Sequence, residues 1–173
     1  EPVLAPGDEI DKVIKTHYGV GGDTVDEMVK TDGIDLIVGG GEDTQDLLEM
    51  AQEASVIKLV NEIILEAINE DASDIHIEPY EHELSIRYRL DGVLHAASVP
   101  PQIRRFQSAI ISRIKILADM NIAEKRLPQD GRIKFAVGTR QVDVRVSVIP
   151  MIFGEGVVMR ILDKSSVLYT LQE

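Results

Sequence analysis

The stretch from Arg140 to Ile149 alternates between apolar and polar side chains, and this pattern restricts the fold more than any other in the chain. Because successive side chains of a β-strand point to opposite faces, a period of two predicts a strand with one buried face and one polar face. Arg145 falls on the polar face. The buried face consists of four valines: Val142, Val144, Val146 and Val148.

The run 125–132, which reads Lys-Arg-Leu-Pro-Gln-Asp-Gly-Arg, precedes this strand. It predicts a tight turn that carries Arg132, followed by paired strands over 133–137 and 140–149. Two arginines displayed from a turn and a sheet can grip a phosphate or a carboxylate in fork geometry. The alternative role, which is the commoner one for such arginines, is that of solvated charges or of internal ion-pair partners.

The order of the remaining patterns predicts an α+β fold with a mostly antiparallel sheet packed against helices. It runs helix, three strands, helix, three strands, with hairpin-length connections such as Asp91-Gly92 and a break at Pro150. Ser55 is a plausible N-cap of the first helix. The helices cover 55–69 and 103–120, and the strands cover 73–79, 84–90, 93–99, 133–137, 140–149 and 157–163.

The helix predicted over 103–120 carries basic residues mostly outside its buried stripe. Basic side chains on a helix surface are usually solvated. The stripe consists of Ile103, Phe106, Ile110, Ile114 and Leu117, and the basic residues are Arg104, Arg105, Arg113 and Lys115.

The part of the chain before residue 54 predicts little globular structure. A short helix fits 6–18, and 19–53 is acidic and rich in glycine, which is typical of a flexible linker, with a short helix over 44–52. The three glycines 39–41 are not followed by the Lys-Ser/Thr pair of a phosphate-binding loop. A hinge is therefore the preferred interpretation of this segment.

Charge is unevenly distributed along the chain. Residues 1–83 hold 22 acidic and 4 basic side chains, whereas residues 84–173 hold 8 and 14, within a net charge of −12. An overall acidic chain argues against nucleic-acid binding, but the basic half can face an anionic site on a partner. The lack of cysteine excludes disulfides and thiolate zinc sites and fits a reducing cytoplasm, and no apolar run is long enough for a membrane span.

The strand predicted over 73–79 offers one further chemical interpretation. Asp74, His76 and Glu78 fall on one of its faces, and two carboxylates with an imidazole can bind a divalent metal. A polar outer face with His76 hydrogen-bonded to its neighbours is the alternative, and it is preferred because no second cluster of ligands completes the site. The prediction is therefore that no metal is bound.

Six motifs, in this order, resemble the secretion ATPases that drive type II secretion and type IV pilus assembly. The resemblance covers about residues 54–164, and residues 1–18 look like the end of that family's preceding N-terminal domain. The motifs lie at 72–79 (ASDIHIEP), 87–93 (RYRLDGV), 112–118 (SRIKILA), 126–132 (RLPQDGR), 142–147 (VDVRVS) and 154–163 (GEGVVMRILD).

The resemblance implies a domain organisation. Residues 54–164 would be the family's second N-terminal domain, a PAS-like module, after the linker 19–53, and residues 165–173 would begin a linker to a RecA-like ATPase domain. The phosphate-binding loop of the family lies beyond this chain, so the chain by itself should not hydrolyse ATP. The family forms cytoplasmic homo-hexamers, peripheral at the bacterial inner membrane, that transmit motion to an inner-membrane platform and assembly proteins.

The resemblance also implies a role for arginines, since in this family arginines of this domain reach the ATP bound by the ATPase domain. By motif position that role falls on Arg132 and Arg145, with Arg126, Arg113 and Arg160 as secondary candidates. ATP and Mg²⁺ would be cofactors of the full-length protein, and neither is expected to bind this chain tightly. Binding of a cyclic dinucleotide, known for the preceding domain of some relatives, finds no support here. The alternative function is a structural adaptor whose arginines form internal ion pairs.

Overall fold

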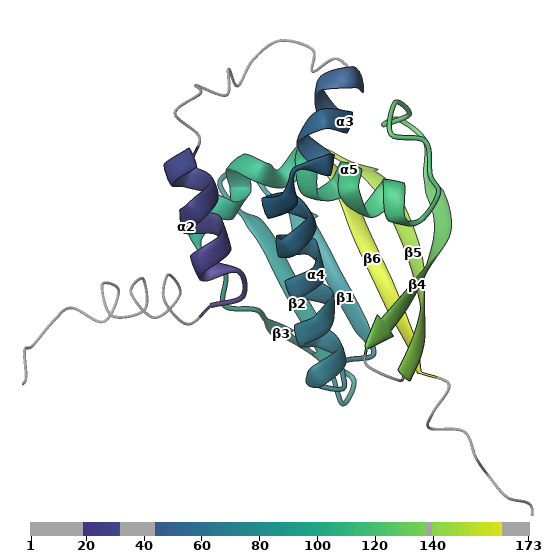
Figure 1. Cartoon of the computed structure of the whole chain (residues 1–173). Coiled ribbons are helices and arrows are strands. Elements are labelled where there is room, and N and C mark those ends of the chain that lie inside the picture. Colours follow the sequence, from purple (N-terminus) through teal and green to yellow (C-terminus); the bar gives the residue numbers. More distant parts are fainter. Residues whose placement is uncertain (1–18, 32–43, 138–139, 164–173) are drawn as a thin grey trace, which may run out of the picture.

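The computed structural model describes residues 19–31, 44–137 and 140–163 (Figure 1). The expected α+β class is confirmed, with helices packed against a six-stranded antiparallel sheet. The helices are α2 (Gly22–Thr31), α3 (Thr44–Gln52), α4 (Ala54–Asn69), the 3₁₀-helix η1 (Pro101–Phe106) and α5 (Gln107–Leu117). The strands are β1 (Asp74–Pro79), β2 (Leu84–Leu90), β3 (Val93–Ala96), β4 (Gln129–Val137), β5 (Arg140–Met151) and β6 (Gly154–Asp163).

The sheet joins two three-stranded meanders. Its strand order is β3-β2-β1-β6-β5-β4, so each meander is consecutive in sequence and the two meet where β1 pairs with β6. This central pairing places Asp74 opposite Arg160 and Ile75 opposite Met159. The Asp91-Gly92 turn between β2 and β3 is confirmed, and both residues have the positive φ values, 49° and 84°, that a tight hairpin turn of this type requires.

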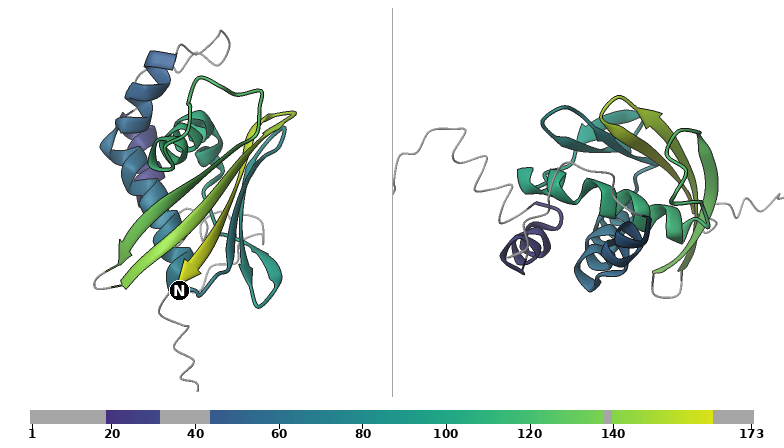
Figure 2. Two further views of the ribbon diagram at one scale, coloured as in Figure 1. Left: turned by 90° about the vertical axis from the view of Figure 1, so that its right-hand side faces the viewer. Right: turned by 90° about the horizontal axis from the view of Figure 1, so that it is seen from above.

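The helices lie on one face of the sheet, which curves around α4 and α5 (Figure 2). We call this the inner face, and the face that no described helix covers the outer face. Alternate residues of each strand point inward, and among them Ile75, Val144 and Met159 are fully buried. On α4 the buried stripe follows helical spacing: Val56, Leu59, Val60, Ile63, Ile64, Ala67 and Ile68.

Two predictions about the second meander were wrong. Arg132 lies inside β4, not in a turn before it, because pairing with β5 already begins at Gln129. Pro150 does not end β5; it pairs with Glu155 of β6. At that position β5 pairs with β6 alone, since β4 starts opposite Val148, and proline is tolerated where a strand has a free side.

The helix predictions also needed correction. The segment expected as one helix over 103–120 begins as η1 and continues as α5, which ends at Leu117. Ser55 is not an N-cap, because α4 starts at Ala54 with Glu53 in the capping position and no side-chain cap bond. Lys115 is not on a solvated surface; it is 1% exposed.

The segment expected as a linker contains ordered helix. The predicted helix over 44–52 is present as α3, but α2 was not predicted. Val25 and Met28 of α2 join the hydrophobic core, and Thr24 donates hydrogen bonds to the Glu62 carboxylate of α4. The short apolar stripe of α2 is interrupted by acids, so periodicity alone did not reveal it. The helix predicted over 6–18 lies outside the described residues, and the domain boundaries stay a prediction.

Candidate functional site

A row of charged residues crosses the outer face of the sheet. Backbone register places Arg132 of β4 opposite Arg145 of β5, and Arg145 opposite Arg160 of β6. Arg160 is in turn opposite Asp74 of β1, which is opposite Arg89 of β2. We call Arg132, Arg145 and Arg160 the arginine row. The structure thus brings together three of the five arginines that the family resemblance pointed to.

The arginine row borders a hollow of about 500 Å³ on the outer face. Arg132 and Arg145 are exposed, and neither forms an ion pair with any residue in the described ranges. Like charges directly opposite each other on neighbouring strands destabilise a sheet, so the row is not explained by its contribution to folding. The hollow is lined by Asp74, Asp130, Gly131, Arg132, Arg145, Val146, Ser147, Val158 and Arg160.

Asp74 is the buried acidic group of this site, at 5% exposure. Its Oδ1 accepts a hydrogen bond of 2.9 Å from Arg160 Nε, and its Oδ2 accepts one of 2.8 Å from Ser73 Oγ. Arg89 Nε lies 3.3 Å from Oδ2. Burial alone would raise the pKa of Asp74, but the bonds from Arg160 and Ser73 and the charge of Arg89 outweigh it, so the pKa is lowered and the carboxylate stays ionised.

The neighbouring carboxylate on β1 is engaged in the same way. Glu78 accepts a short hydrogen bond from Arg87 and a further one of 3.2 Å from Tyr80, and its Oε1 lies 3.4 Å from His76 Nδ1. These bonds offset the effect of burial and lower the pKa of Glu78. Asp74 and Glu78 thus have guanidinium partners, and the described residues contain no group of three side chains that could hold a metal ion.

The other two candidate arginines lie apart from the row. Arg113 is half-buried on α5, the helix that lies over the inner face of the sheet (Figure 1). Arg126 is exposed in the segment between α5 and β4, and both Nε and Nη2 donate to the carboxylate of Glu124, at 3.2 and 3.0 Å. With its backbone amide also donating, Arg126 lowers the pKa of Glu124 to about 2.

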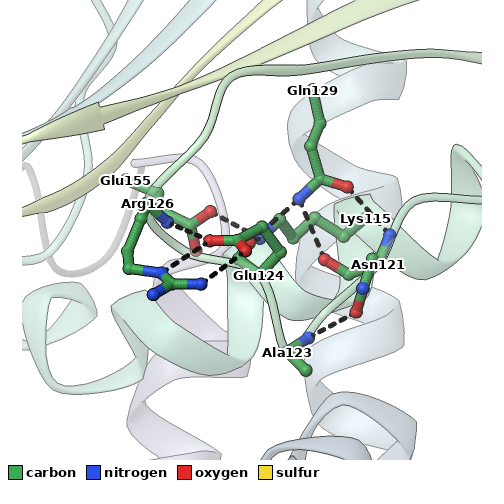
Figure 3. Close-up of polar contacts among 7 residues, drawn as sticks. All are labelled: Lys115, Asn121, Ala123, Glu124, Arg126, Gln129 and Glu155. Carbon is green, nitrogen blue, oxygen red and sulfur yellow. Dashed lines mark hydrogen bonds and ion pairs between the residues drawn. The ribbon is translucent and has the colours of Figure 1, made fainter.

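A buried lysine ties this segment to the rest of the domain (Figure 3). Lys115 Nζ forms an ion pair with Glu155 at the start of β6 and donates a hydrogen bond of 2.7 Å to the backbone carbonyl of Glu124. Gln129 holds the same segment from the β4 side, because its Nε2 donates to the carbonyls of Asn121 and Glu124, both at 2.9 Å. The start of the strand that carries Arg132 is therefore anchored.

Sequence reasoning missed this anchor. Helical periodicity put Lys115 outside the buried stripe, since a lysine is rarely fully buried unless it is paired. Its partner Glu155 lies 40 residues further on, between two glycines that come just before the strand predicted over 157–163. Only the three-dimensional packing of α5 against β6 brings the two charges together.

Comparisons with known proteins show clear similarity. Residues 49–173 match the model of the family described as Type II/IV secretion system protein. The type IV pilus assembly ATPase PilB of Myxococcus xanthus is 45% identical over 170 residues, 96% of this chain, and the type II secretion system protein E of Xanthomonas campestris is 47% identical over 161 residues, 93% of it. The type II secretion system ATPase E of Vibrio cholerae is 54% identical over 122 residues, 70% of the chain.

The chain spans only part of these relatives: 30%, 28% and 24% of their respective lengths. None of the helices in the described ranges is long and apolar enough to cross a membrane.

Proposed function

Because the chain belongs to the Type II/IV secretion system protein family, we propose that it is a non-catalytic N-terminal domain of an ATPase that powers type II protein secretion or type IV pilus assembly. In this proposal the parent protein carries a separate RecA-like domain that binds ATP and Mg²⁺. The domain described here packs on that ATPase domain within a homo-hexamer. Its movements are transmitted to an inner-membrane platform and its assembly proteins, which places the parent at the cytoplasmic side of the inner membrane.

The single observation that carries the proposal is the unpaired arrangement of Arg132 and Arg145. Two arginines directly opposite each other on adjacent strands, whose backbones lie about 4.7–4.9 Å apart, suit a phosphoryl group with charge on several oxygens. An arginine supplied to a nucleotide from outside the catalytic domain can be worth about 10³–10⁵ in rate, by neutralising charge on the transferring phosphoryl group. We propose that Arg132 and Arg145 contact the ATP phosphates in the assembled parent.

Replacing either arginine by alanine tests this proposal in the full-length parent. We expect Arg132→Ala and Arg145→Ala each to lower kcat/KM for ATP hydrolysis by about 100-fold, a loss of about 2.7 kcal/mol of transition-state stabilisation. Both side chains are exposed, so the melting temperature should stay close to that of the parent. Steady-state hydrolysis and thermal melting of the purified hexamer measure the two effects.

Arg105→Ala is the matched control for these variants. Arg105 is an exposed arginine on η1, outside the hollow, and its loss should leave hydrolysis unchanged. Full activity in both Arg132→Ala and Arg145→Ala would refute the contact with ATP and leave a domain that only carries motion.

A structural adaptor that docks partner proteins is the second candidate function. It is favoured by the remaining outer-face arginines, because Arg87, Arg89 and Arg160 all have internal carboxylate partners. This function predicts that arginine substitutions lower stability and leave ATP hydrolysis intact. The same two measurements therefore separate the candidates.

A further inference from the structure

We propose that Asp74 is a positioning residue that orients Arg160 as the third guanidinium of the arginine row, so that the row suits a chain of phosphoryl groups rather than a single one. The inference rests on the proposed function, because it concerns the same hollow and the same class of ligand. Asp74 itself would not touch the nucleotide.

The contact between the two residues leaves the phosphate-binding end of Arg160 available. Asp74 Oδ1 accepts from Arg160 Nε at 2.9 Å, and this is the only hydrogen bond that the Arg160 side chain makes with described residues. A guanidinium group has five N–H donors in a planar fork, and holding Nε fixes the plane while the four donors on Nη1 and Nη2 stay free. Consistent with this, the Arg160 side chain is 67% exposed and borders the hollow.

Asp74 is itself held rigidly. It is 5% exposed, and its Oδ2 accepts a hydrogen bond from Ser73 Oγ. Arg89 also lies near Oδ2, and it belongs to β2, on the other side of β1 from the strand that carries Arg160. Arg89 does not line the hollow. Asp74 therefore has one guanidinium neighbour within the hollow and one outside it, and the latter helps to keep the carboxylate in place.

Stability alone does not account for this arrangement. Asp74 is buried and loses much of its hydration, whereas the Arg160 side chain is 67% exposed, and an ion pair with an exposed partner contributes little to stability. The strands at this point of the sheet already pair through their backbones, with Asp74 opposite Arg160 and Ile75 opposite Met159. A carboxylate at position 74 can fix the plane of the Arg160 guanidinium group, and an apolar residue there could not.

The spacing of the row indicates the class of ligand. Arg132, Arg145 and Arg160 lie on three adjacent strands, so their backbones span about 10 Å at 4.7–4.9 Å per strand. One phosphate group is gripped by one or two guanidinium forks. Three forks over this span suit the linked phosphates of a nucleoside di- or triphosphate.

Steady-state ATP hydrolysis by the full-length parent tests the inference, with Asp74→Ala, Asp74→Asn, Arg160→Ala and Arg89→Ala compared. We expect Asp74→Ala and Arg160→Ala each to raise KM for ATP about 10-fold. The Asp74→Ala/Arg160→Ala double variant should be no worse than Arg160→Ala alone, because Asp74 acts only through Arg160. Asp74→Asn keeps an acceptor oxygen for Arg160 Nε, so its KM for ATP should be closer to that of the parent than the KM of Asp74→Ala is. Arg89→Ala removes only the support that Asp74 has outside the hollow, so it should raise KM for ATP less than Asp74→Ala does.

The outcomes separate the positioning role of Asp74 from the proposed contact of Arg132 and Arg145 with ATP. Two results would overturn the positioning role of Asp74, provided that Arg132→Ala and Arg145→Ala still impair hydrolysis. One is a lowered melting temperature in Asp74→Ala with an unchanged KM for ATP. The other is an increase of KM in the double variant that equals the product of the two single increases. Full hydrolysis in Arg132→Ala and Arg145→Ala would instead remove the proposed function on which the inference rests.

Discussion

Replacing Lys115 by methionine is expected to lower the free energy of unfolding by about 3–5 kcal/mol, because it leaves the buried carboxylate of Glu155 without its partner. Lys115 is 1% exposed and Glu155 is 9% exposed, so water cannot solvate the remaining charge. Methionine also removes the donor to the Glu124 carbonyl. Urea denaturation, read as a lower midpoint at unchanged slope, measures the loss.

The Lys115→Met/Glu155→Leu double variant is the control for this prediction. When both charges are replaced by apolar side chains of similar size, most of the loss should be recovered, because no uncompensated charge is left in the interior. A single Lys115→Met variant with the stability of the parent would show that the ion pair is not buried as described.

Gly131→Ala is expected to cost about 3 kcal/mol of stability and to displace the strand that carries Arg132. A Cβ at Gly131 would lie 2.4 Å from the backbone carbonyl oxygen of Ala118, at the end of α5. Backbone at that distance cannot move aside cheaply, so β4 and α5 have to separate. We expect both a lower unfolding midpoint in urea and a lower rate of ATP hydrolysis in the full-length parent.

Gly156→Ala is the matched control within the same sheet. Its added Cβ would meet the sulfur of Met151, also at 2.4 Å, but that sulfur is near the end of a flexible and 36% exposed side chain that can rotate away. Its cost should be clearly smaller than that of Gly131→Ala. Equal losses in the two variants would argue against a close approach of α5 and β4.

Much of the fold could be predicted because its strands obey simple alternation. The valines of β5 and most apolar residues of β1 and β2 are buried on one face, as the period of two indicated. The strand ends could not be predicted in the same way. Pairing extends β4 back to Gln129 and β5 on to Met151, and a partner strand can hold residues such as Pro150 that read locally as a break.

The candidate site was only partly accessible from the sequence. Motif position indicates Arg132 and Arg145, but their placement opposite each other depends on the register of β4 against β5. Pairing of Asp74 with Arg160 joins residues 86 positions apart, and no local pattern encodes it. By alternation alone Asp74 shares a strand face with His76 and Glu78, which suits a metal site, whereas in the fold its charged partners are the guanidinium groups of Arg89 and Arg160.

The sheet order also has a consequence for how the domain acquires its site during folding. Each meander closes through neighbouring strands, whereas the central pairing of β1 with β6 must bring residues 74–77 to residues 157–160. Closing so long a loop carries an entropic cost that the short hairpins do not, and such non-local contacts slow folding. Because Asp74 and Arg160 belong to different meanders, a half-folded domain would present Arg132 and Arg145 but not the oriented third arginine. A nascent chain would therefore complete the row only when the sheet itself is complete.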